Sequence, residues 1–137
     1  MHAWHGHDER RVPPLVLGHE AAGIALSGKY KDQRVVINPL MNCDNCEACN
    51  CGDEHLCPDR ELIGMRVPGA FAEKVAVRER NLTPLPDHLG FEDAALAEPL
   101  ACAVHTVRIG LAHGRKDAGE LRAVVLGGGA IGLLSAL

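Results

Sequence analysis

Residues 43–57 read CDNCEACNCGDEHLC, and they contain five of the six cysteines of the chain. Spacers of two, two and seven residues separate four of these cysteines: Cys43, Cys46, Cys49 and Cys57. A closed structural zinc site takes four thiolates at about 2.3 Å around one tetrahedral ion. Two-residue spacers let successive thiols turn toward one point, and they make disulfides between neighbours awkward. The pattern predicts a structural zinc site in this loop.

Other interpretations of the same cysteine cluster are an iron–sulfur cluster and an oxidised cysteine pair. Cys51 is a fifth thiol of the loop, which we expect not to bind the ion, with exchange against Cys49 as the alternative. Gly52 is expected to supply a turn before the fourth ligand. The remaining cysteine, Cys102, is expected to be a buried and inert thiol.

Composition narrows the class of protein. The chain has 137 residues, 47% of them hydrophobic, a net charge of −4 and only 3% aromatic residues. An acidic chain with few aromatic rings is a poor nucleic-acid binder. The longest apolar stretch, residues 123–137, is shorter than the ~20 residues of a membrane span. No export signal follows Met1, so we expect a cytoplasmic protein, where clustered thiols are more often metal ligands than disulfides.

The hydrophobic pattern predicts strands before residue 91 and helices after it. Alternating or β-branched stretches predict three strands, over residues 21–26, 34–38 and 69–78. From Phe91 the apolar residues recur at three and four positions, which predicts helix. We expect a short helical turn over residues 91–97 and a second helix from Pro99, with Glu98 at or near its N-cap. Beyond a loop over residues 110–119, we expect a strand over residues 122–126 and a helix from Ala130.

A second group of candidate metal ligands is less specific in its spacing. His19 and Glu20 open the first predicted strand, and such a pair is commonly a surface pair. Catalytic zinc takes three protein ligands from His, Cys or carboxylate and keeps one position open. His19 and Glu20 could supply one or two of them. Glu98 is a third candidate, because a helix start stabilises a carboxylate.

A glycine-rich turn follows the predicted strand over residues 122–126. Residues 127–132 read GGGAIG, which fits the G-x-G-x-x-G dinucleotide fingerprint between a strand and a helix. In that fingerprint Gly127 allows the tight turn, Gly129 lets a pyrophosphate approach the backbone, and Gly132 permits close helix–strand packing. The alternative is an ordinary glycine-rich turn between a packed strand and helix.

These signals, in this order, resemble the zinc-dependent alcohol dehydrogenases of the medium-chain dehydrogenase/reductase superfamily, and within it the polyol (sorbitol-like) and threonine dehydrogenase branch. The matching stretches are GHEAAG at residues 18–23, the cysteine loop, GAFAE at residues 69–73, AALAEPLA at residues 94–101 and the glycine turn. The resemblance implies a mainly β fold with α-helices. It would be a GroES-like, partly open β-barrel over residues 1–108 with a zinc lobe at residues 41–60. The start of a Rossmann NAD(P)-binding domain would follow over residues 109–137.

The resemblance also implies roles for particular residues. His19 would bind the catalytic zinc, Glu20 would be a ligand or a close neighbour of the ion, and Glu98 matches a glutamate ligand of polyol enzymes. His2 resembles a histidine that relays the alcohol proton to solvent. The implied activity is hydride transfer from a small alcohol or polyol to NAD or NADP, by a homo-oligomer.

The family's first zinc-ligating cysteine belongs to a segment that would precede Met1. We therefore expect an internal fragment of such an enzyme, which alone oxidises no alcohol. The alternative is a non-catalytic zinc-binding remnant module that keeps the four-cysteine lobe only.

Overall fold

The computed structural model describes residues 5–113 and 122–137 of the chain. By its internal contacts the chain divides into two compact units, Met1–Ala95 and Leu96–Leu137, and each is described by itself. The domain boundary after residue 108, which the resemblance implies, stays a prediction. The elements run in the order β1 (Ala22–Ile24), β2 (Arg34–Ile37), β3 (Leu40–Met41), α1 (Glu47–Asn50), η1 (Glu54–Leu56), β4 (Glu61–Leu62), η2 (Glu79–Asn81), β5 (Leu82–Pro84), α2 (Phe91–Ala95), α3 (Ala97–His113) and α4 (Ala130–Ala136).

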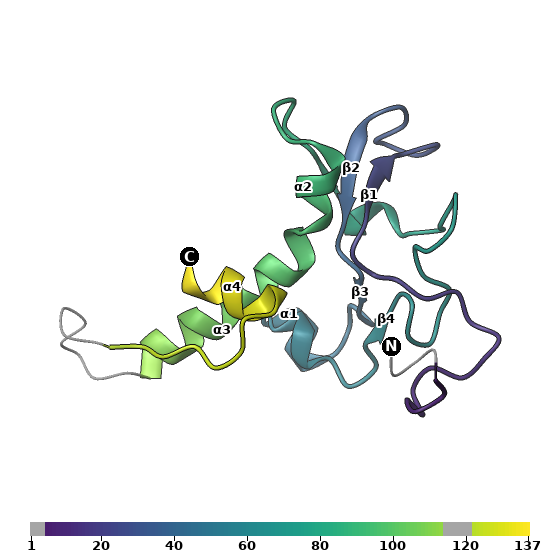
Figure 1. Ribbon diagram of the computed structural model, residues 1–137. Helices are drawn as coiled ribbons and strands as arrows, with labels where there is room; N and C mark the ends of the chain where they lie inside the picture. The colour runs from purple at the N-terminus through teal and green to yellow at the C-terminus, as the bar shows by residue number, and fades with distance from the viewer. Residues whose placement is uncertain (1–4, 114–121) are drawn as a thin grey trace. The chain divides into compact units, whose positions relative to one another are not determined.

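The first unit is built on a three-stranded antiparallel sheet in the order β1-β2-β5 (Figure 1). Its central strand β2 alternates in burial, and Val35 and Ile37 are 4% and 9% exposed. The strand predicted over residues 34–38 is confirmed. The strand predicted over residues 21–26 is also present, but it is shorter than predicted. The short helix α2 contacts β1, and the Arg34 guanidinium lies 4.9 Å from the centre of the Phe91 ring.

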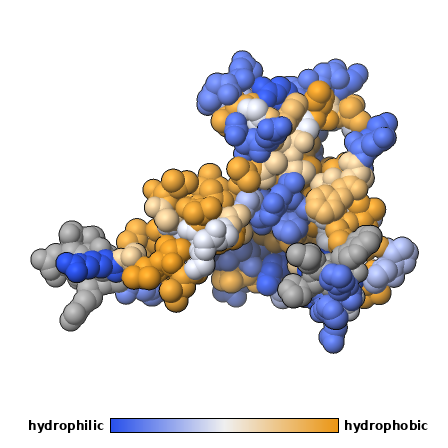
Figure 2. Space-filling view, viewed as in Figure 1, coloured by the Kyte–Doolittle hydropathy of each residue, from blue (hydrophilic) through white to orange (hydrophobic). Residues whose placement is uncertain are grey.

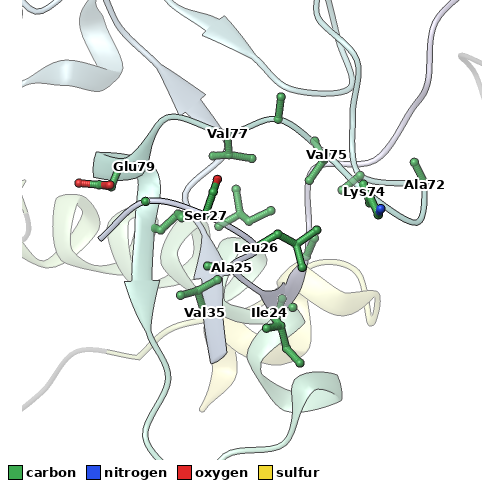
Figure 3. Close-up of a pocket in the computed structure, with 18 of the residues that line it drawn as sticks. Ile24, Ala25, Leu26, Ser27, Val35, Ala72, Lys74, Val75, Val77 and Glu79 are labelled. Carbon is green, nitrogen blue, oxygen red and sulfur yellow. The ribbon is translucent and has the colours of Figure 1, made fainter. Parts of the chain in front are cut away.

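The strand predicted over residues 69–78 is wrong. These residues form no ladder with another strand, although Gly69, Ala70 and Phe71 donate backbone hydrogen bonds to residues 16–18. Residues 72–77 instead lie across a cavity of about 690 Å³ from β1 and β2, and Val75, Val77 and Val35 are among its lining side chains (Figure 3). A β-ladder needs a neighbour at about 4.8 Å, so the hydrophobic alternation lines this hollow without making a strand.

Three glycines pack at the point where the segment before His19 crosses residues 64–69. A Cβ atom on Gly64 would lie 2.5 Å from the carbonyl oxygen of Gly18, and one on Gly69 would overlap the same oxygen. Gly18 and Gly64 also have positive φ angles of 97° and 74°, which favour glycine. This crossing, closed by the hydrogen bond from Ala70 N to Gly18 O at 2.9 Å, fixes the backbone from which His19 projects.

The second unit consists of α3 and α4, which pack on one another. The helix predicted from Pro99 begins two residues earlier, at Ala97, so Glu98 lies within the first turn and not at the N-cap. Pro99 is tolerated there because the first-turn N–H groups have no helical partner. The short helix expected over residues 91–97 ends at Ala95.

The strand predicted over residues 122–126 is also not formed, because no other strand of the described chain pairs with these residues. The loop expected over residues 110–119 is partly helix, since α3 continues to His113, and the rest of it lies outside the described residues. Hydrophobic side chains cover much of the visible surface of α3 and α4 (Figure 2). The exposed hydrophobic residues of these two helices include Leu100, Val104, Val107, Ile109, Leu111 and Leu133. Within residues 5–113 and 122–137, no helix combines the length and the hydropathy that a bilayer span requires.

The glycine crossing predicts a large effect of one methyl group. Gly64→Ala should lower the free energy of unfolding by about 1–3 kcal/mol, because it places a Cβ at positive φ and against Gly18. Urea unfolding of the full chain measures this. Gly23→Ala is the matched control, since a Cβ there meets nothing within 4 Å. Equal stability of Gly64→Ala and the unsubstituted chain would contradict the role of the crossing.

Candidate metal and cofactor sites

The four cysteines of the predicted zinc site meet in the first unit. Their sulfur atoms all lie within 4.8 Å of one another, with Cys46 Sγ to Cys49 Sγ at 3.4 Å and Cys43 Sγ to Cys49 Sγ at 3.9 Å. A tetrahedral ion with ligands at about 2.3 Å needs sulfur–sulfur edges of about 3.8 Å. None of the six cysteines forms a disulfide, and Cys51 and Cys102 are exposed, the latter against expectation. The donor set and its spacing therefore fit one zinc ion.

Local backbone geometry turns the sulfurs inward. The short helix α1 (Glu47–Asn50) carries Cys49 one turn after Cys46, which precedes the helix. Gly52 has a φ of 84° and open space around it, so the turn predicted there is present and needs glycine for its backbone angle. The 3-10 helix η1 (Glu54–Leu56) then leads directly to Cys57, which is 0% exposed.

The surroundings of the four sulfur atoms give the cysteines different pKa values. Asn42 Nδ2 donates to Cys49 Sγ at 3.3 Å, and this hydrogen bond is the main reason that the pKa of Cys49 is lowered to about 6. The backbone N–H of Cys49 lowers the pKa of Cys46, but burial and hydrogen bonds to the other sulfurs outweigh it and raise that pKa to about 12. Asn42 could not be predicted from the sequence, because an asparagine beside a cysteine carries no distinctive signal.

His19 and Glu20 follow the glycine crossing directly. The His19 side chain is half-buried and that of Glu20 is exposed, and their ligating atoms lie within 4.8 Å of each other. Imidazole nitrogen and carboxylate oxygen are both ligands that zinc accepts. The pair therefore offers two of the three ligands that a catalytic zinc site requires.

Glu98 lies in the second unit, in the first turn of α3. Its Oε1 atom accepts a hydrogen bond from Cys102 Sγ at 3.5 Å, one helical turn later. The helix dipole favours a negatively charged side chain in a first turn, and Glu98 lies there without being the N-cap. His2, the expected proton relay, lies outside the described residues.

The glycine turn precedes α4 in the second unit. Gly127 has a φ of 104°, and a Cβ atom on Gly132 would overlap the carbonyl oxygen of Gly127. The tight turn predicted at Gly127 is therefore present. Gly132 packs closely against this turn, although no strand forms over residues 122–126 as the predicted helix–strand packing would require. A Cβ on Gly129, which precedes α4, would meet nothing within 4 Å, so the backbone there is open to a ligand.

Comparison with known proteins places the first unit in a family. Residues 1–87 match the model of the alcohol dehydrogenase GroES-like domain. The chain belongs to this family. The predicted fold class, a GroES-like domain of the dehydrogenase fold, is confirmed by this match and by the structural neighbours.

Relatives with established names are dehydrogenases of sugar acids, polyols and amino acids. The chain is 38% identical to 2-dehydro-3-deoxy-L-galactonate 5-dehydrogenase of Pseudoalteromonas atlantica, over 99% of this chain and 40% of the relative. It is 36% identical to sorbitol dehydrogenase of Bacillus subtilis, over 89% of this chain and 35% of the relative. It is also 36% identical to L-threonine 3-dehydrogenase of Mesorhizobium japonicum, over 100% of this chain and 40% of the relative. These names confirm the predicted branch.

Solved structures agree with the relatives. Galactitol-1-phosphate dehydrogenase of Escherichia coli matches with a TM-score of 0.79 and 30% identity, over 93% of this chain and 37% of that one. A zinc-binding dehydrogenase of Sinorhizobium meliloti 1021 with NADP bound matches with a TM-score of 0.76 and 33% identity. The match covers 98% of this chain and 39% of that one. The chain thus spans about 40% of the length of the proteins that it matches.

The sulfur geometry predicts which cysteines bind zinc. Cys57→Ser should abolish tight binding of one zinc ion, because it removes the most buried of the four ligands. Cys51→Ser and Cys102→Ser, which remove the exposed thiols, should leave this binding unchanged. Competition with a chromophoric chelator measures the affinity. Loss of affinity in Cys51→Ser but not in Cys57→Ser would contradict the assignment.

Zinc affinity should fall as the pH falls from about 8 to 6. The thiols of Cys46 and Cys57 have raised pKa values and are protonated near neutral pH, so zinc must displace their protons. Protons compete more strongly in acid, which fixes the sign. Calorimetry in buffers of different ionisation enthalpy counts the released protons. An affinity independent of pH, with no proton release, would contradict thiolate ligation.

Proposed function

We propose that this chain forms the zinc-binding part of a zinc-dependent, NAD(P)-linked alcohol or polyol dehydrogenase. The observation that carries the proposal is the four-sulfur cluster of the lobe over residues 41–60, within a chain of the alcohol dehydrogenase GroES-like family. In this proposal Cys43, Cys46, Cys49 and Cys57 hold a structural zinc ion. The family's relatives act on small alcohols, and the names sorbitol and galactitol-1-phosphate dehydrogenase support a polyol as substrate.

His19, Glu20 and Glu98 are the proposed ligands of a second, catalytic zinc ion. Zinc bound there would supply a Lewis acid that lowers the pKa of a coordinated alcohol. The glycine crossing sets the direction of His19 from the backbone, and Glu98 lies in the first turn of α3, where the helix dipole favours a carboxylate. His2 is proposed to pass the alcohol proton to solvent. An imidazole side chain suits this role because imidazole takes up and releases a proton near neutral pH.

The proposed place of NAD or NADP is the glycine turn, at Gly127, Gly129 and Gly132. The open backbone at Gly129 would let a pyrophosphate approach, and the NADP in one structural neighbour supports a dinucleotide partner. The proposal includes the domain boundary after residue 108, a cytoplasmic location and a homo-oligomer. Since the chain spans about 40% of its relatives, we expect no alcohol turnover from these residues alone.

The number of zinc sites tests the proposal against the remnant module, which keeps only the lobe. The dehydrogenase proposal expects two zinc ions per full chain, of which Cys57→Ser loses one and His19→Ala or Glu98→Gln loses the other. Atomic absorption after gel filtration counts them. Glu73→Gln, which removes an exposed carboxylate that is not a proposed ligand, should lose neither.

The outcomes separate the two candidates. A single ion that is lost in Cys57→Ser and kept in His19→Ala would contradict the catalytic site and support the non-catalytic remnant. A chain that retains no zinc at all would contradict both.

A further inference from the structure

Asn42 is the only residue of the lobe besides Cys57 that the structure buries, among residues 41–60. It is 5% exposed, and it precedes the first cysteine of the cluster. Its Nδ2 atom donates to two acceptors, Cys49 Sγ at 3.3 Å and Asp44 Oδ1 at 2.9 Å. The polar side chain therefore touches the metal-binding sulfur from inside the protein.

Arg80 fixes the orientation of the Asn42 amide. Its Nη2 atom donates to Asn42 Oδ1 at 2.8 Å, and its Nη1 atom donates to Asp44 Oδ1. A guanidinium has donors only, so the atom facing it must be the amide oxygen, and the amide nitrogen must then face the sulfur. The other two contacts are to the carbonyl oxygen of Asn42, from Arg78 Nη1 at 3.0 Å and Arg80 Nη2 at 3.3 Å. The Asn42 amide therefore has one orientation in this network, with its N–H group toward the sulfur.

We propose that Asn42 is a positioning residue for the Cys49 thiolate of the zinc site, and that Arg80 holds it in place. This inference rests on the proposed structural zinc site. Four thiolates around one Zn²⁺ leave an excess of negative charge, which N–H donors and nearby guanidinium groups stabilise. Groups that orient a metal ligand typically change metal affinity by about 10–100-fold when they are removed.

The network spans a long stretch of sequence. Asn42 and Arg80 are 38 residues apart, and Arg80 belongs to η2, directly before the sheet strand β5. The zinc lobe is thereby attached to the sheet of the first unit through the same side chain that contacts the sulfur. Order in the sheet and the geometry of Cys49 are coupled at Asn42.

Two substitutions of Asn42 isolate the donor. Asn42→Asp keeps the oxygen that Arg80 contacts and removes the N–H toward Cys49, whereas Asn42→Leu removes both. Asn45→Asp and Asn45→Leu are the matched controls, because Asn45 is an exposed asparagine of the same loop. Each full-length variant is titrated with Zn²⁺ against a chelator and with Co²⁺ in an absorption cell.

We expect both Asn42 variants to lose about 10–100-fold in Zn²⁺ affinity, and the Asn45 variants to lose less than twofold. Without the N–H donor the sulfur lone pairs rise in energy, so the sulfur-to-cobalt charge-transfer band should move to longer wavelength. A merely structural role would change the affinity and leave the position of this band unchanged. Asn42 variants with the affinity and the band of the unsubstituted chain would overturn the inference.

Arg80→Lys decides the matter if the Asn42 variants fail to fold. It keeps the positive charge at a half-exposed position and removes the fork that reaches Asn42 and Asp44 together. We expect a several-fold faster release of Zn²⁺ and the same direction of band shift. Unchanged release and spectrum would overturn the inference. If the unsubstituted chain binds neither metal, the proposed zinc site itself fails, which is a different result.

Discussion

The loop between β3 and β4 has almost nothing to bury, so its shape depends on four sulfur atoms meeting at one point. Among residues 41–60 only Asn42 and Cys57 are buried. A segment that buries so few side chains cannot offset the entropy lost on ordering its backbone. Structural zinc in small peptides contributes an apparent ~10–16 kcal/mol at neutral pH. An ion held by the cysteines would therefore supply most of the order of the lobe.

The rest of the first unit holds the two ends of this loop. The two-residue strands β3 and β4 pair across it, with Leu40 opposite Leu62. Next to this pair, the Asn81 side chain donates to the carbonyl oxygens of Asn38 and Leu40 at 2.8 and 2.6 Å. Asn81 ends η2, the helix that also carries Arg80 to Asn42. The base of the lobe is thus held by the β3–β4 pair and by the hydrogen bonds of Asn81 and Arg80.

The sequence predicted the features that depend on neighbouring residues. The β-branched residues at 35–37 lie in β2, the apolar residues spaced at three and four positions lie in α3, and Gly52 and Gly127 have the positive φ angles expected of turns. The four cysteines likewise predict a metal site, because three of them lie within seven residues. In each case the required information is contained in one short segment.

The sequence failed where a structure depends on a distant partner. Residues 69–78 and 122–126 have the hydrophobic pattern of strands, but no strand in the described part of the chain pairs with them to complete a ladder. The strands β3 and β4 were missed because two residues carry no periodicity. Asn42 was missed because its role arises only when η2 brings Arg80 against it. The hydrophobic pattern of a segment shows which of its faces is apolar. It does not show which distant segment packs against that face.

X-ray absorption at the zinc edge of the full chain tests the central claim most directly, since it measures the atoms around the ion without substitution. The account predicts, for protein loaded with one equivalent of zinc, four sulfur scatterers at about 2.3 Å. A first shell made mostly of nitrogen or oxygen at about 2.0 Å would contradict it.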